Sequence, residues 1–271
     1  MNEFPIVDDL ELAQRALVAA DLVSMPGFLS RKFKTSKKKD NTPVTEIDLA
    51  VEKTVRSVIS DARPRDSIYG EELSDSSWQT EPRPGRQWTI DPIDGTAGFA
   101  RGIPVWATLI SLMLDGVPVV GAVSAPAIGK SWIGAKGLGS WSRTSEIKSK
   151  RTLRVSGTRS LADAVISYNS AAQWIDSGRQ EALLQLTTEA GMTRAFGDFW
   201  SYMLVAEGAI DMAGEPDLRP YDIAPLVPIV EEAGGRFSSL DGNRSVWEGT
   251  ALATNGILHD EIIQLVSGES S

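Results

Sequence analysis

The sequence places two carboxylates three residues apart in the run Asp91-Pro92-Ile93-Asp94-Gly95-Thr96, directly after an apolar segment with strand character. Across a turn stiffened by proline, both carboxylates can converge on one point while the Ile93 carbonyl faces the same side. A hard cation such as Mg²⁺ prefers such a set of oxygen ligands. Gly95 and Thr96 would open the next helical turn and present backbone N–H groups to a phosphate oxygen. In isolation, this spacing is more often a capped surface turn.

Acidic residues recur at other positions where an element begins or ends. Glu71 and Glu72 stand at the end of a second apolar strand, and Asp222 stands at the predicted start of a helix. Asp48 lies in the first turn of another helix, for which Thr45 is the predicted N-cap. Each acid has an ordinary alternative role, because acids cap helices and complement the helix dipole. Two acidic strand ends in succession nevertheless favour a metal site.

The elements that must position these residues change in type near residue 145. Over 1–145, apolar residues recur at helical spacing in 8–24 and 47–59, and β-prone runs follow in 67–72, 87–96 and 106–141. This pattern predicts an α+β half with an antiparallel sheet and most of the metal ligands. Over 146–271, strands and helices alternate, which predicts an α/β half that contributes Asp222. The predicted elements there are a strand at 164–168 and helices at 178–190, 199–208 and 222–233, followed by a final helix.

A basic, glycine-free run from Arg31 to Asn41 separates the first two predicted helices. Its weak apolar periodicity predicts a solvated loop. The alternative is a mobile flap near a phosphate.

Composition excludes several kinds of site and partner. The 271-residue chain has no cysteine and a single histidine, His259, which excludes disulfides, thiolate ligands and a zinc site built on several imidazoles. A net charge of −9 disfavours nucleic acid and anionic membrane as partners. No run approaches the roughly 18 apolar residues that cross a bilayer, and the N-terminus lacks a secretory pattern. We therefore expect a cytoplasmic protein that holds any metal through oxygen, with His259 at the surface.

Together with the segment Asp40 to Asp48, the acidic motifs reproduce in order and spacing the signature of the inositol monophosphatase superfamily. The chain resembles this superfamily over nearly its whole length. The resemblance implies an α-β-α-β-α layered fold, a homodimer, a small phosphate ester as substrate and up to three Mg²⁺ ions in the active site.

The resemblance also implies a role for each matched residue. One ion would be held by Glu71, Asp91 and the Ile93 carbonyl, and a second by Asp91, Asp94 and Asp222. Glu71, which also counts among the catalytic residues, would help to hold the third ion, and Glu72 would support the site. The positions of Asp48 and Thr96 form a hydrogen-bonded pair that orients or deprotonates the attacking water.

Two segments depart from the inositol-specific pattern and resemble the bacterial histidinol-phosphate phosphatases of the superfamily. The first has Arg101 in place of a typical histidine and continues to Trp106, and the second, Gly197 to Tyr202, places an acid and aromatics near the leaving group. We therefore expect substrate contacts from Arg101, Trp106, Asp198 and Glu215, because acids and aromatic rings suit an amine and an imidazole. The alternative is that Trp106 is a core residue and that Asp198 caps the helix after it.

Three other functions were weighed against a histidinol-phosphate phosphatase. An inositol-1-phosphatase or a broad sugar phosphatase would share every metal ligand and differ only in the leaving-group pocket, which belongs to the 146–271 half. A metal-binding regulatory homologue without turnover would keep the same fold. A nucleotide-binding module has no support, because the chain has neither GxxxxGK[ST] nor a strand-linked GxGxxG.

Overall fold

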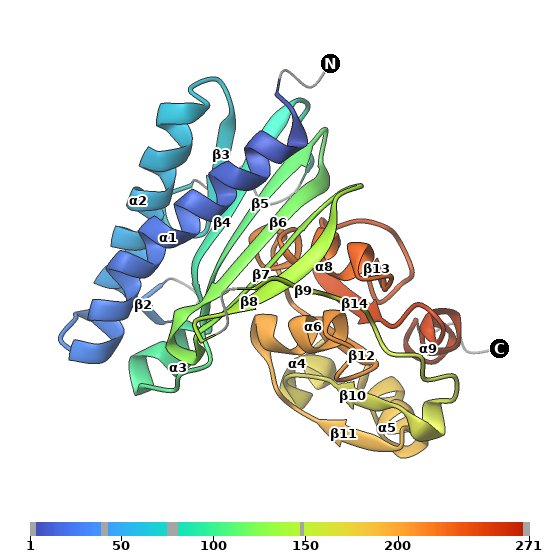
Figure 1. The fold of residues 1–271 in the computed structure, drawn as a ribbon. Helices are drawn as coiled ribbons and strands as arrows, with labels where there is room; N and C mark the ends of the chain where they lie inside the picture. Colours follow the sequence, from blue (N-terminus) through green and yellow to red (C-terminus); the bar gives the residue numbers. More distant parts are fainter. Residues whose placement is uncertain (1–3, 39–42, 75–80, 147–148, 268–271) are drawn as a thin grey trace.

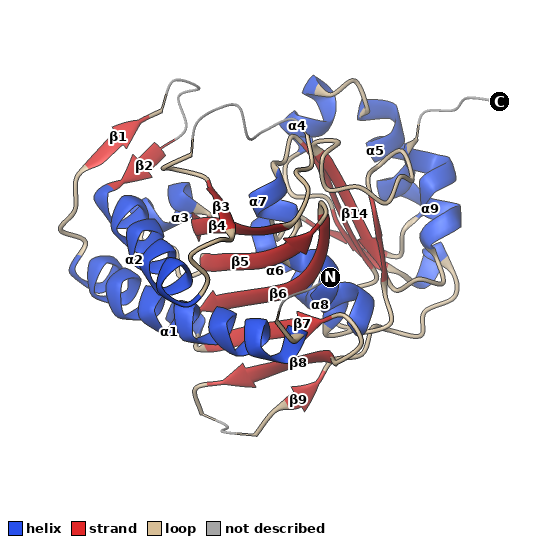
Figure 2. Cartoon of the chain, turned by 90° about the horizontal axis from the view of Figure 1, so that it is seen from above, coloured by secondary structure: helices blue, strands red, loops and turns tan. Residues whose placement is uncertain are grey.

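Helical and sheet layers alternate through the molecule (Figures 1 and 2). The computed structural model describes residues 4–38, 43–74, 81–146 and 149–267. A seven-stranded and a five-stranded sheet each carry helices on their outer face, and further helices fill the space between the two sheets. The predicted α-β-α-β-α sandwich is confirmed.

Two long helices, α1 (Ile6–Ser30) and α2 (Glu46–Ala62), form the first outer layer. Their apolar faces pack on the seven-stranded sheet, because leucine, alanine, valine and isoleucine recur on one side of each helix. The predicted cap of α2 is confirmed: Thr45 Oγ1 accepts the Ile47 N–H, and Asp48 Oδ2 accepts the Thr45 N–H. Within the described ranges, no helix is long and apolar enough to cross a membrane.

The seven strands of the larger sheet follow sequence order. β3 and β4 are parallel, and each later neighbour pair is antiparallel, which confirms the predicted hairpins over 106–141. The strands are β3 (Ser67–Gly70), β4 (Arg86–Asp94), β5 (Ala107–Leu114), β6 (Val117–Ala125), β7 (Lys130–Ala135), β8 (Gly139–Thr144) and β9 (Arg151–Thr152). The division of the chain near residue 145 stays a prediction.

The basic run after α1 is not wholly a loop. β1 (Thr35–Lys37) pairs antiparallel with β2 (Pro43–Thr45), so backbone pairing forms a short hairpin where the side-chain pattern indicated none. All three residues of β1 are exposed, which explains why no apolar alternation marks it. The end of the run, 39–41, lies outside the described residues.

The layer between the sheets consists of α6 (Asp198–Ala206), α7 (Pro220–Ile223) and α8 (Leu226–Glu232). The prediction of one helix over 222–233 was wrong. Pro225 lacks a backbone N–H to continue the helix from α7, and it becomes the N-cap of α8 instead. α6 begins at Asp198, one residue before the predicted start.

The five-stranded sheet has the order β11-β10-β12-β14-β13. β10 is parallel to β11 and β12, whereas β14 is antiparallel to β12 and β13. The strands are β10 (Val165–Ser167), β11 (Met192–Arg194), β12 (Met212–Pro216), β13 (Arg236–Ser238) and β14 (Thr250–Thr254). Short 3₁₀ helices at Pro126–Ile128 and Leu161–Asp163 join neighbouring elements.

The second outer layer consists of α4 (Ala171–Asp176), α5 (Gln180–Glu189) and α9 (His259–Val266). The sequence analysis missed α4, which is only six residues long but buries Trp174 completely. The expected surface position of His259 was wrong, because its ring is fully buried. The ring lies 3.0 Å from both the Ser238 and Thr254 hydroxyls, and burial lowers its pKa to about 4.

A buried carboxylate joins α1 to the sheet. Asp21 Oδ2 accepts a hydrogen bond of 2.8 Å from the Ser124 hydroxyl on β6, while Oδ1 is buried without a hydrogen-bond partner among the described residues. Burial raises the pKa of Asp21 to about 6, and the Ser124 bond offsets part of that rise. Because the folded pKa exceeds the unfolded value, ionisation of Asp21 reduces stability as pH rises from about 4 through 6.

We expect Asp21→Asn to be more stable than the wild type at pH 8, by roughly 1–3 kcal/mol, because the ionised carboxylate is removed. The difference should shrink as pH falls towards 4. Urea unfolding at several pH values, in EDTA, measures it. A gap that stays constant or grows at low pH would contradict this assignment.

Candidate active site

The carboxylates of Asp91 and Asp94 meet because β4 is irregular at its end. Asp91 pairs with Leu109 and Asp94 with Ala107, so two residues of β4 oppose one residue of β5 in a bulge. The Thr108 hydroxyl donates a hydrogen bond of 2.9 Å to the Pro92 carbonyl, and this bond stabilises the bulge. Residues three apart in a regular strand point to opposite faces of the sheet. The bulge changes this alternation, so the side chains of Asp91 and Asp94 converge as predicted.

Asp222 reaches the same point from α7 in the layer between the sheets. Its Oδ2 accepts the Arg219 N–H at 2.7 Å, within a capping box at the helix start. One carboxylate oxygen each of Asp91, Asp94 and Asp222 lie within 4.8 Å of one another. The structure thus brings together three of the predicted metal ligands.

The electrostatics of this cluster fit a divalent cation. Burial raises the pKa of Asp91 and Asp94 well above the usual value, and neighbouring carboxylates raise both further. Burial and then the Glu71 charge raise the pKa of Asp222 to about 7. Oδ1 of Asp91 is buried and has no hydrogen-bond donor among the described residues. Because all the ligand atoms are oxygens with uncompensated charge, the residues present fit Mg²⁺.

Glu71 and Glu72 extend the cluster from the end of β3. Lys38 Nζ lies 2.5 Å from Glu71 Oε1 and 2.6 Å from Glu72 Oε1. Burial is the largest cause of the raised pKa of Glu71, and the Lys38 charge opposes it. The basic segment after α1 therefore reaches the acidic cluster, as the flap alternative expects.

Asp48 in the first turn of α2 lies beside Thr96, the first residue of α3 (Thr96–Arg101). The Thr96 hydroxyl is 3.0 Å from Asp48 Oδ1 and 2.8 Å from the Ile93 carbonyl. Thr45 donates to Asp48 Oδ2 through its N–H at 2.9 Å and its hydroxyl at 2.5 Å. Burial raises the pKa of Asp48 although these bonds lower it, so the group can accept a proton.

Gly95 occupies a position that only glycine fits well. Its φ of 84° is in the left-handed region, and a Cβ there would lie 3.3 Å from the Asp198 carboxylate. Next to it, the Phe199 N–H at the start of α6 donates 2.7 Å to Asp94 Oδ2. The start of α6 therefore lies directly against the acidic cluster.

A cavity of about 130 Å³ opens beside the cluster and is lined by both halves of the chain. Asp94 and Asp222 form one side, and Asp198 and Glu215 contribute two more acids. Burial raises the pKa of Asp198 and raises that of Glu215 to about 8. These carboxyl groups resist ionisation in the cavity wall unless a positive charge compensates them. The cavity therefore favours a cationic ligand.

Two residues of this cavity were missed by the sequence analysis, Asn169 and Gln173. The Asn169 amide donates to the Glu215 carboxylate, and Gln173 Oε1 is buried without a hydrogen-bond partner among the described residues. Asn169 lies two residues after β10 with φ of 56°, a conformation that asparagine tolerates. A polar residue at the carboxyl end of a parallel strand is the signal that points to it.

Arg101 and Trp106 do not line this cavity. Trp106 is fully buried, with its ring 4.9 Å from that of Phe99 and 5.4 Å from that of Phe28, which fits the alternative of a core residue. Arg101 is exposed at the end of α3. The aromatic groups that do line the cavity are Phe199 and Tyr202.

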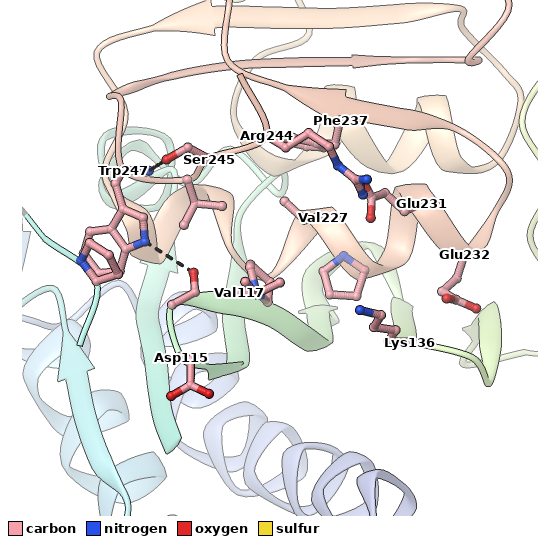
Figure 3. Close-up of a pocket in the computed structure, with 15 residues that line it drawn as sticks. Asp115, Val117, Lys136, Val227, Glu231, Glu232, Phe237, Arg244, Ser245 and Trp247 are labelled. Carbon is pink, nitrogen blue, oxygen red and sulfur yellow. Dashed lines mark hydrogen bonds and ion pairs between the residues drawn. The ribbon is translucent and has the colours of Figure 1, made fainter. Parts of the chain in front are cut away.

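Another cavity, of about 370 Å³, lies between α8, the β5–β6 turn and the segment 244–247 (Figure 3). Its acids already have partners: Glu232 accepts two backbone N–H groups at 2.8 Å, and Glu231 pairs with Arg244 at 2.7 Å. None of the predicted site residues lines it. The predicted acids lie instead in the cluster around Asp91 and in the cavity beside it.

Comparisons with known proteins agree with this geometry. The model of the inositol monophosphatase family matches residues 9–271. A histidinol-phosphatase of Streptomyces coelicolor is 46% identical over 95% of this chain and 96% of its own length. A histidinol-phosphatase of Mycobacterium tuberculosis is 45% identical over 94% of this chain and 96% of its own. The solved inositol monophosphatase from Anabaena covers 96% of this chain and 95% of its own at 26% identity, with a TM-score of 0.78.

We expect Mg²⁺ to raise the melting temperature and EDTA to lower it, because a bound cation relieves the repulsion among the acids. At about ten times the Kd, the rise should be roughly 3–5 °C. It should be larger at pH 8 than at pH 6, because the raised pKa values make protons compete with the metal. Differential scanning fluorimetry, with NaCl at equal ionic strength as control, measures this. An unchanged melt in millimolar Mg²⁺ would contradict the metal site.

Proposed function

Because this chain belongs to the inositol monophosphatase family, we propose that its acidic site is the active site of a Mg²⁺-dependent histidinol-phosphatase. The reaction is the hydrolysis of L-histidinol phosphate to L-histidinol and phosphate, a step of histidine biosynthesis. The observation that carries the substrate is a pair of acids, the half-buried Asp198 and the buried Glu215, in the wall of the cavity that Asp94 and Asp222 also line. The two histidinol-phosphatases that match nearly the whole chain support it.

In this proposal, the clustered carboxylates hold up to three Mg²⁺ ions. Glu71, Asp91 and the Ile93 carbonyl would hold one, and Asp91, Asp94 and Asp222 a second. Glu71 would share in holding the third, with Glu72 beside it. When bound, the metal supplies positive charge that offsets the phosphate and the leaving oxygen in the transition state.

Asp48 and Thr96 would handle the attacking water. The Thr96 hydroxyl lies between the Asp48 carboxylate and the end of β4, so the pair can orient a water and take its proton. Two hydrogen bonds from Thr45 hold the other oxygen of the Asp48 carboxylate, Oδ2. Gly95 and Thr96 form the start of α3, and their backbone N–H groups would bind a phosphate oxygen.

The leaving alcohol would occupy the cavity between α6 and β12. A protonated amine can pair with Asp198 or Glu215, and ionisation of these carboxyls is favoured once a cation is present. Phe199 and Tyr202 offer aromatic surface to an imidazole ring. An inositol ring carries only neutral hydroxyls and would leave the two acids without a cation.

Assembly and location also form part of the proposal. The family resemblance implies a homodimer and the sequence predicts a cytoplasmic location, and both stay predictions. The bacterial sources of the two matching histidinol-phosphatases are consistent with a cytoplasmic enzyme.

We expect phosphate release from L-histidinol phosphate to be fast with Mg²⁺ and absent with EDTA. Inositol-1-phosphate should be a poorer substrate by at least roughly tenfold in kcat/KM, because it lacks the cation that the cavity favours. A malachite-green assay on both esters, side by side, measures the ratio. Preference for inositol-1-phosphate would overturn the substrate while keeping the metal chemistry.

The variant Asp198→Asn should lose roughly 10- to 100-fold in kcat/KM on histidinol phosphate, which is the usual cost of one charge-assisted hydrogen bond. The loss on inositol-1-phosphate should be several-fold smaller. Asp115→Asn is a matched control, because Asp115 has the same φ of 51° but lies in the β5–β6 turn, away from the cavity. Equal losses on both esters would exclude a recognition role for Asp198.

A further inference from the structure

One carboxylate of α2 is buried and has no role in the chemistry described so far. Glu52 is completely buried and lies one helical turn after Asp48, on the same face of α2. A buried carboxylate is costly unless its oxygens receive hydrogen bonds and its charge is paired. The partners of Glu52 therefore indicate why it is there.

Its partners are the backbone of the turn that carries the Glu71 ligand. Glu52 Oε2 accepts the Glu72 N–H at 2.7 Å, and Oε1 accepts the Leu73 N–H at 3.2 Å. The Glu71 N–H itself donates to the Ile90 carbonyl on β4 at 3.1 Å. The turn after β3 is therefore held from α2 on one side and from β4 on the other.

The fit between Glu52 and this turn is close enough to determine a residue type. A Cβ on Gly70 would lie 2.0 Å from Glu52 Oε1 and 2.4 Å from its carboxyl carbon. The φ of Gly70 is not in the left-handed region, so the backbone does not require glycine. The Glu52 carboxylate requires it, because any side chain would displace the carboxylate from the turn.

Arg56 balances the charge and closes the arrangement. Its Nε donates 2.7 Å to Glu52 Oε1, and its Nη2 donates 2.7 Å to the Ser74 hydroxyl. That hydroxyl in turn accepts the Gly70 N–H at 2.9 Å. Glu52 is thus neutralised by Arg56, which lies outside the acidic cluster.

We infer that Glu52 is a positioning residue for the Glu71 metal ligand. It holds the turn after β3 so that the Glu71 carboxylate faces Asp91, and it acts on the ions only through that turn. The inference rests on the proposed Mg²⁺ site. It adds a residue that would not itself contact the metal, because both of its carboxylate oxygens accept backbone N–H groups. Supporting groups of this kind typically change metal affinity 10- to 100-fold.

The test is Glu52→Gln, which keeps size but replaces one acceptor oxygen by an NH₂ group that must face a donor. The matched control is Glu232→Gln, because Glu232 also accepts two backbone N–H groups, of Gly137 and Gly139, and it lines the other cavity (Figure 3). Both variants should melt lower than the wild type in EDTA. Isothermal titration with Mg²⁺ should show roughly 10- to 100-fold weaker binding for Glu52→Gln and about unchanged binding for Glu232→Gln.

Turnover provides the second readout. The Mg²⁺ concentration for half-maximal rate should rise in Glu52→Gln, while kcat at saturating Mg²⁺ stays within about threefold, because Asp48 and Thr96 are intact. If Glu52→Gln does not fold, Arg56→Gln is the second variant. Arg56 is partly exposed, and its substitution removes the ion pair with the Glu52 carboxylate. This variant should weaken Mg²⁺ binding several-fold. Wild-type affinity in the folded variant overturns the inference. A wild-type protein that binds no Mg²⁺ overturns the proposed function itself.

Discussion

Like charges buried side by side repel strongly, and the site of this protein depends on that repulsion. The carboxylates of buried Asp91 and of half-buried Asp94 and Asp222 converge on one point, where water screens their charges only in part. Burial first, and then the repulsion among the carboxylates, raises the pKa values of Asp91 and Asp94. The Lys38 ammonium lies between Glu71 and its neighbour Glu72 and compensates part of the charge. A cluster that is costly alone becomes a strong site for a hard cation.

The surrounding structure keeps the acids from moving apart. A bulge in β4 fixes two of them, a capping box in α7 fixes the third, and the backbone turn after β3 is held from α2. Each device uses backbone groups inside packed layers, where small displacements cost free energy. Carboxylates whose backbone is fixed in this way lose little freedom when a cation binds, which favours well-oriented binding.

The sequence predicted the ligand set better than it predicted the surroundings. Asp91 and Asp94 lie at the end of β4 on either side of Pro92 and Ile93, so their spacing predicted the convergence but not the bulge against β5 that produces it. His259 was misplaced because its ring packs against the hydroxyl of Ser238 on β13, 21 residues earlier, as well as that of Thr254 on β14, and no local pattern predicts this packing. Asn169 and Gln173 were missed because a loop and a six-residue helix carry them, without any periodic pattern. Trp106 has the residue type of a ligand contact, but the packing of α1 and α3 encloses it.

The site is divided between the two sheets of the sandwich. The residues proposed to act on phosphorus lie mainly on or next to β3, β4 and α2, whereas Asp198 and Glu215, which are proposed to face the departing alcohol, come from α6 and β12. Mutations in the second group can therefore alter which alcohol is accepted while the first group keeps its geometry. Where hydrolysis and recognition of the alcohol are divided in this way, substitutions confined to the second group can redirect the same reaction to another phosphate ester.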